Sequence, residues 1–105
     1  MPGIDFRELR RRVKIGRVLE LAGFQSCWRR GEQVRGPCPL HGSHSGRSRS
    51  LAAHLGKGVY HCFVCGAAGN TLDLWVALSG QPLHRAAVDL CERLGLEVPW
   101  LGRAD

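Results

Sequence analysis

The chain has 105 residues, with 15 Lys and Arg against 9 Asp and Glu, five cysteines and a net charge of +6. A chain of this length forms one small domain, and no apolar stretch approaches membrane-spanning length. Asp5, Arg7 and Glu8 occupy the segment where a secretory signal needs apolar residues. We therefore expect no membrane partner and a chain that is kept in the reducing cytoplasm.

The positive charge is concentrated in the first half of the chain. Twelve of the Lys and Arg residues precede Gly58, against four acidic residues, so this part carries +8 and the remainder −2. Such a concentration is typical of contact with a polyanion such as nucleic acid.

The first clear periodic pattern predicts an amphipathic helix over 15–22. Apolar residues recur there at helical spacing, at Ile15, Val18, Leu19 and Ala22. Gly23 supplies the expected end of this helix.

Short strands are predicted at 32–35, 50–55 and 58–61. The segment 42–50 between the first two is rich in Gly and Ser and carries Arg47 and Arg49. This composition predicts a flexible basic loop.

Two short motifs follow the first and last of these strands, Cys38-Pro39-Leu40-His41 and Cys62-Phe63-Val64-Cys65. Each has two residues between its potential ligands, and nearby glycines permit the tight turns that such motifs need. Three thiolates and one imidazole form a closed tetrahedral set, with no carboxylate and no open position for a catalytic water. The spacing therefore predicts a structural Zn²⁺ site.

The alternative for these cysteines is a disulfide or ordinary buried thiols. An odd count of five and the expected reducing compartment disfavour a disulfide. Cys27 and Cys91 stand outside both motifs, and Cys91 lies in an apolar helical stretch where a small buried thiol is expected.

Two helices are predicted after the second motif. Asn70 and Asp73 form a capping-box pattern before a helix that ends at Gly80. Pro82 opens the next, whose apolar stripe runs to Gly95. Arg85, Asp89 and Arg93 lie at i, i+4 spacing on it and are expected to form a solvated row of ion pairs.

Three stretches together resemble one family. These are 38–41, 60–70 (YHCFVCGAAGN) and the closing segment 86–99, and they look like the CHC2-type zinc-binding domain at the N-terminus of bacterial replicative DNA primases. The resemblance implies a small α+β zinc ribbon with a short antiparallel sheet and flanking helices. It would form a single domain over 1–105, with a helical segment at 4–23, the ribbon at 33–66 and helices at 70–95.

The resemblance also implies the functional residues. The zinc ligands would be Cys38, His41, Cys62 and Cys65. The exposed face of the sheet and the basic loop would contact single-stranded template DNA, with Arg47, Arg49, Lys57, Tyr60 and His61 as candidates. The alternative for this set is a merely solvated basic loop beside a partly buried tyrosine.

The chain departs from the family pattern in two ways. The family usually follows its histidine with Lys and then Pro-Ser-Phe, whereas 42–51 is longer and lacks the Pro and Phe. The chain also ends shortly after this domain, and its nine acidic residues are scattered, so we expect no primer synthesis by this polypeptide alone.

Three classes of function remain open from the sequence. The first is a primase-type zinc ribbon that binds single-stranded DNA in replication and primer initiation. The second is an adaptor that docks a replicative helicase or a primase catalytic subunit through the helix at 83–94 or through Trp100. The third is a duplex-DNA regulator that uses the basic segment 7–17, although three consecutive arginines point in different directions around a helix. Trp28 is expected either to stack a base or to pack the first helix against the sheet.

Overall fold

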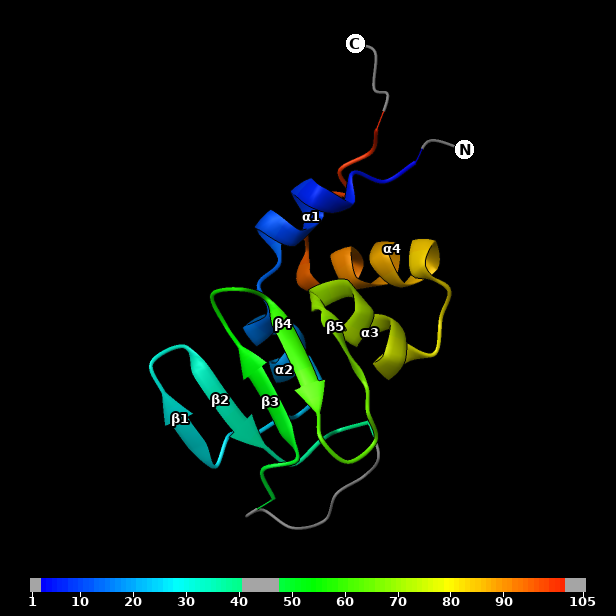
Figure 1. Ribbon diagram of the computed structural model, residues 1–105. Coiled ribbons are helices and arrows are strands. Elements are labelled where there is room, and N and C mark those ends of the chain that lie inside the picture. Colours follow the sequence, from blue (N-terminus) through cyan, green and yellow to red (C-terminus); the bar gives the residue numbers. More distant parts are fainter. Residues whose placement is uncertain (1–2, 41–47, 102–105) are drawn as a thin grey trace.

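A five-stranded antiparallel sheet organises the chain in the computed structural model, which describes residues 3–40 and 48–101. The strands lie side by side in chain order (Figure 1). They are β1 (Trp28–Arg30), β2 (Gln33–Gly36), β3 (Leu51–His54), β4 (Val59–Cys62) and β5 (Ala68–Asn70). With the helices below, this confirms the predicted small α+β architecture.

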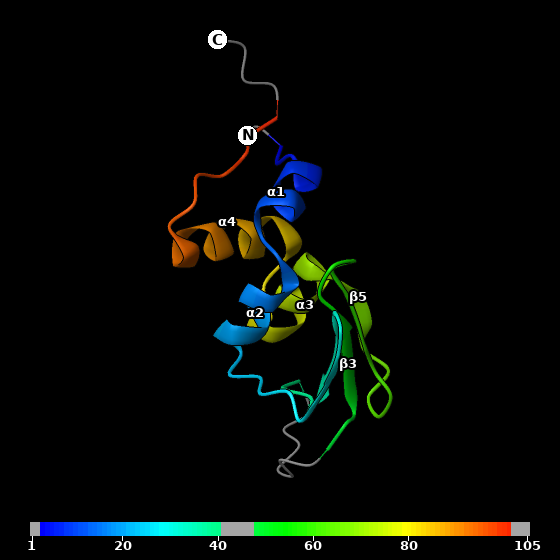
Figure 2. The same cartoon turned by 90° about the vertical axis from the view of Figure 1, so that its left-hand side faces the viewer.

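The two faces of the sheet differ in what covers them. The register places Val34 beside Ala53 and Ala53 beside Tyr60, and all three side chains are buried. The helices α2 (Ile15–Leu21) and α3 (Thr71–Ser79) lie on one side of the sheet, and no described helix lies on the other (Figure 2). Because side chains alternate along a strand, the neighbouring row, with Arg35 and His61, faces the open side.

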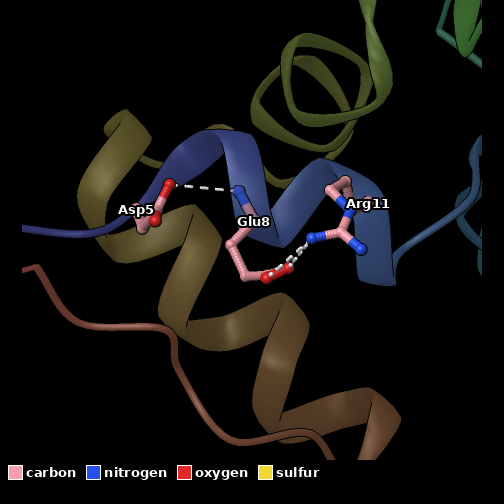
Figure 3. A network of polar contacts seen from close by, with 3 residues as sticks. All are labelled: Asp5, Glu8 and Arg11. Carbon is pink, nitrogen blue, oxygen red and sulfur yellow. Dashed lines mark hydrogen bonds and ion pairs between the residues drawn. The ribbon is translucent and has the colours of Figure 1, made fainter.

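The N-terminal segment contains two short helices where the apolar pattern indicated one. α1 (Phe6–Arg12) begins at Asp5, whose Oδ1 accepts a hydrogen bond of 3.1 Å from the Glu8 backbone N–H (Figure 3). Glu8 in turn pairs with Arg11 at 2.8 Å. α2 then follows the predicted periodicity, and Gly23 adopts a positive φ of 75° just after its end.

The two C-terminal helices begin and end where the sequence predicted. Asn70 and Asp73 form the reciprocal capping box of α3, and Gly80 ends that helix in the left-handed conformation. α4 (Leu83–Leu94) follows Pro82 and ends at Gly95. Leu74 of α3 and Leu90 of α4 are fully buried in the common core.

The chain segments near the two ends lie together. Ile4 pairs with Trp100 in an antiparallel bridge, and the Asp5 N–H donates to the Pro99 carbonyl at 2.7 Å. Since α1 follows directly, this pairing brings α1 next to α4 (Figure 1).

Two features differ from the sequence predictions, and one open alternative is narrowed. β1 and β5 have three residues each and were not predicted, because strands this short carry almost no periodic signal. Of the two alternatives for Trp28, its place on β1 beside Arg35, in the lining of the open face, fits stacking better than packing against the first helix. Only half of the expected row of ion pairs is seen among the described residues. Asp89 pairs with Arg93 at 3.0 Å, whereas Arg85 forms no ion pair there. Asp89 also accepts a hydrogen bond from Trp75 Nε1 at 3.3 Å.

Within 3–40 and 48–101, none of the helices has both the length and the apolar composition needed to span a lipid bilayer.

Candidate metal centre and open sheet face

Three cysteine side chains converge at one end of the sheet. The sulfur atoms of Cys38, Cys62 and Cys65 all lie within 4.8 Å of one another, although 24 residues separate Cys38 from Cys62 in the chain. Cys38 and Cys62 are buried and Cys65 is exposed. His41, the fourth predicted ligand, lies outside the described residues.

Tight turns position these sulfurs. The backbone N–H of Cys65 donates to Cys62 Sγ at 3.4 Å, and the N–H of Leu40 donates to Cys38 Sγ at 3.4 Å. Gly66 closes the second turn with a positive φ of 78°, a conformation that favours glycine. N–H groups that point at sulfur stabilise the thiolate form, which is the form that binds a metal.

The electrostatics of Cys62 agree with this geometry. Burial on its own would raise the pKa of the Cys62 thiol. Hydrogen bonds from the backbone N–H groups of Cys65 and Val64 and from the thiols of Cys65 and Cys38 outweigh burial and lower this pKa from 9.0 to about 6. The lowered pKa favours the thiolate form of Cys62 near neutral pH.

The donor set fits zinc. A tetrahedral Zn²⁺ with Zn–S bonds of about 2.3 Å holds its sulfurs about 3.8 Å apart, within the separation that the three cysteines already have. Soft thiolate ligands select zinc over the harder divalent ions, which prefer oxygen. The three-sulfur cluster is thus a zinc-type centre that needs one further ligand.

The open face of the sheet forms a shallow groove of about 400 Å³ next to this centre. Side chains from β1, β2, β3 and β4 and from the turn after β4 line it. They include Trp28, Arg35, Ala52, His54, Val59, His61 and Phe63. The groove combines aromatic rings with basic groups and contains no carboxylate among its lining residues.

The aromatic and basic side chains of this groove contact one another. The rings of His61 and Phe63 meet edge to face at 4.6 Å, and the Arg35 guanidinium lies 5.0 Å from the centre of the Phe63 ring. Arg35 Nη2 also donates to the Arg49 carbonyl at 2.8 Å, while its buried Nε–H has no partner among the described residues. Phe63 is 60% exposed, which is unusual for a large apolar side chain.

The predicted nucleic-acid contacts are distributed differently from the expectation. His61 and Arg49 are exposed, and His61 lines the groove. Tyr60 lies on the covered face and is only 5% exposed, and burial together with the nearby Asp73 carboxylate raises its pKa. Tyr60 is nevertheless among the residues that line the groove, so its contact with nucleic acid stays a prediction. Arg47 lies outside the described residues.

Lys57 is exposed on the turn between β3 and β4 and lines a different hollow. Sequence reasoning missed Arg35 and Phe63 as members of the groove and left the role of Trp28 open. Side chains alternate between the two faces of the strand at 32–35, so Arg35 lies on the face opposite to that of the buried Val34. This pattern was visible in the sequence.

An antiparallel sheet with a cysteine-rich metal centre at one end, flanked by helices on one face, defines a zinc-ribbon protein. Residues 4–104 match the family described as the CHC2 zinc finger, and the chain belongs to this family. The zinc that the resemblance implied is therefore supported by both the family and the three-cysteine cluster.

The relatives of this chain are DNA primases. It is 30% identical over 98 residues to the DNA primase of Geobacillus stearothermophilus, covering 93% of this chain and 16% of that protein. It is 37% identical over 70 residues to the DNA primase of Treponema pallidum, covering 67% of this chain and 11% of the relative. The chain therefore spans only a small part of these relatives.

A solved structure has the same fold. The Aquifex aeolicus primase, described with its zinc-binding and RNA polymerase domains, matches with a TM-score of 0.70 and 25% identity, covering all of this chain and 24% of the other.

Proposed function

We propose that this chain is a primase-type zinc ribbon that binds single-stranded template DNA in primer initiation during DNA replication. The observation that carries the proposal is the helix-free sheet face, whose groove joins stacking rings to arginine next to the metal centre. Bases of a single strand are unpaired, so their faces are free to stack on exposed aromatic side chains.

In this proposal zinc is structural, and Cys38, His41, Cys62 and Cys65 hold it. The metal would join the end of β2 to the turn after β4, and that turn carries Phe63. Fixing these two segments would hold the aromatic edge of the groove in place. Bound zinc would cross-link these two segments of the chain, and side chains would make the contacts with DNA.

The proposed DNA contacts extend across the open face. Trp28, His61 and Phe63 would stack bases, and Arg35 would donate to a phosphate oxygen. The Arg35 guanidinium lies 5.0 Å from the centre of the exposed Phe63 ring, so a phosphate that it holds would lie close to a base stacked on that ring. Arg47 and Arg49 would hold the backbone electrostatically.

We further propose that the chain does not synthesise primers on its own and works with a primase catalytic subunit or domain and with a replicative helicase. The region 1–105 would act as one domain in the cytoplasm, where reducing conditions keep its thiols available for zinc. Nucleotidyl transfer needs a cluster of carboxylates that bind divalent metals. That cluster would come from the partner.

The decisive experiment is a fluorescence-anisotropy titration of zinc-loaded protein with single-stranded and duplex DNA of the same sequence at two salt concentrations. We expect preference for the single strand and a salt dependence that flattens in the Arg47→Ala/Arg49→Ala variant. The matched control is Arg11→Ala/Arg17→Ala, which removes the same charge from α1 and α2. Control protein should bind the single strand within about two-fold of wild type, a difference of about 0.4 kcal/mol.

The other outcomes would each favour a different class. Stronger binding to duplex DNA would favour a regulator that uses the basic segment 7–17. No binding to either DNA would favour an adaptor, for which Leu83 and Leu101 offer exposed apolar side chains near the start of α4 and the C-terminal segment.

A further inference from the structure

A second hollow lies away from the open face, where the α1–α2 junction meets the turn between β3 and β4. Its volume is about 230 Å³, and none of its lining residues lines the groove on the open face. The lining comes from the end of α1, the start of α2, the turn 55–58 and the start of α3 at Asn70 and Thr71.

Three cationic side chains converge on this hollow, Arg10, Lys14 and Lys57, and its lining includes no carboxylate. In the described part of the chain, none of the three forms an ion pair. The carboxylate of Glu32 also approaches Gly56, but Glu32 belongs to the lining of an adjoining hollow. Asp73 also lies beside the lining, since its Oδ2 accepts from the Asn70 N–H at 2.9 Å, but among the described residues neither carboxylate forms an ion pair with Arg10, Lys14 or Lys57.

Arg11 and Arg17 on the same two helices provide a contrast. Arg11 pairs with Glu8 at 2.8 Å, as Figure 3 shows, and Arg17 pairs with Glu20 at 3.8 Å. Neither lines this hollow. Within the residues that the structure describes, the basic side chains that line the hollow are thus unpaired, whereas Arg11 and Arg17, which form ion pairs, lie outside its lining.

The hydroxyl of Thr71 adds a polar group to the cationic lining. Thr71 is only 3% exposed and belongs to the lining of the hollow. A Cβ at Gly58 would lie 3.3 Å from Thr71 Oγ1, so the absence of a side chain at Gly58 leaves the hydroxyl accessible from the turn. The Thr71 hydroxyl is therefore a polar group that a ligand in the hollow can reach.

We propose that this hollow binds a phosphate chain, the group carried by a nucleoside triphosphate or by the 5′-triphosphate end of a nucleic-acid strand. Three cations match the several negative charges of a linear triphosphate, and charge-assisted hydrogen bonds to phosphate are the strong class. The Thr71 hydroxyl donates to one further oxygen. The proposal does not depend on base stacking at the open face, because a phosphate chain has no base.

Isothermal titration calorimetry of the zinc-loaded full chain with sodium tripolyphosphate tests this site directly. We expect saturable binding that weakens about ten-fold or more in Arg10→Ala/Lys14→Ala. The control Arg11→Ala/Arg17→Ala removes the same charge from α1 and α2 and should stay within about two-fold of wild type. Zinc content and circular dichroism establish that both variants are folded.

Thr71→Val provides a second, uncharged test, since it keeps the shape of the side chain and removes the hydroxyl. It should weaken tripolyphosphate binding about three-fold or more. No binding by wild type, or equal weakening in the two double variants, would overturn the proposal, because the effect would then be net charge alone.

Two further ligands distinguish the source of the phosphate chain. ATP that binds as tightly as tripolyphosphate indicates a free nucleotide. A strand with a 5′-triphosphate that binds more tightly than its 5′-hydroxyl counterpart, with a difference that Arg10→Ala/Lys14→Ala removes, indicates a strand end. Either result supports the site.

A variant of the open face separates this proposal from single-strand binding. Phe63→Ala should weaken binding of a 5′-hydroxyl strand and leave tripolyphosphate binding unchanged. If it weakens both equally, the hollow is not a separate site and the proposal fails, whereas a failure of strand binding alone leaves the phosphate site intact.

Discussion

The hydroxyl of Ser50 accepts a hydrogen bond from the backbone N–H of Cys38 at 3.2 Å, although twelve residues separate them. The carbonyl of the same serine accepts from the Phe63 N–H at 2.8 Å. Ser50 is buried and therefore joins the turn after β2 to the turn after β4 from within the protein. Both cysteine motifs are held by this one residue in addition to any metal.

Ser50→Ala should reduce zinc affinity about 10- to 100-fold, because residues that orient metal ligands typically contribute this much. Competition with a chromogenic chelator measures the affinity. Ser26→Ala changes an exposed serine outside the two motifs and should leave zinc affinity unchanged. Equal affinities in the two variants would show that the Ser50 hydroxyl does not position Cys38.

Cys62→Ser should abolish stoichiometric zinc and unfold the ribbon, since metal binding and folding are linked when the ligands are distant in the chain. Elemental analysis and thermal unfolding followed by circular dichroism give the two readouts. Cys27→Ser, at an exposed cysteine outside the cluster, should keep both zinc and fold. A Cys62→Ser protein that retained its zinc and its fold would refute the ligand assignment.

Phe63→Ala should weaken single-stranded DNA binding about ten-fold, because base–aromatic stacking contributes about 1–3 kcal/mol and the Arg35 guanidinium also loses its aromatic neighbour. Anisotropy titration measures this effect. Val64→Ala is the control, since Val64 is adjacent and 71% exposed but does not line the groove. Similar losses in both variants would mean that the aromatic ring is not the contact.

Reaction with a coloured thiol reagent at pH 8 should separate the cysteines by environment. Cys27 is exposed and should react quickly. Burial raises the pKa of the Cys91 thiol, so little of it is thiolate and it should react only after unfolding. The three cluster thiols should become reactive when a chelator removes zinc. A Cys91 that reacts as quickly as Cys27 in the folded protein would contradict the burial of α4 against the core.

Gly36→Ala should destabilise the protein by about 1–3 kcal/mol, because a Cβ there would lie 2.7 Å from the Gln25 carbonyl oxygen, which is backbone and cannot easily move. Gly16→Ala is the matched comparison. At that helical position the added carbon would make an ordinary contact of 3.8 Å with Leu55, so it should stabilise by about 0.5–1 kcal/mol. Urea unfolding of zinc-loaded protein measures both. Equal changes in the free energy of unfolding for the two variants would show that the backbone around Gly36 moves to accept the added carbon without loss of stability.

Local patterns in the sequence were sufficient for several elements. The capping box at Asn70 and Asp73 and the left-handed Gly80 and Gly95 depend on neighbouring residues only, and all appear where predicted. The separation of the cysteines within Cys62–Cys65 likewise defines a turn that needs no distant partner. Short-range geometry of this kind can be read from the order of residues.

The sequence by itself therefore determined the helices after residue 70, the two cysteine motifs and a basic first half. Only the tertiary structure decided that Tyr60 is covered while Phe63 is exposed, that Arg35 stands over that ring, and that Lys57 belongs to a hollow with Arg10 and Lys14. The physical reason is that these relationships depend on strand register and on which face the helices cover. Both are set by packing between residues that are far apart in the chain.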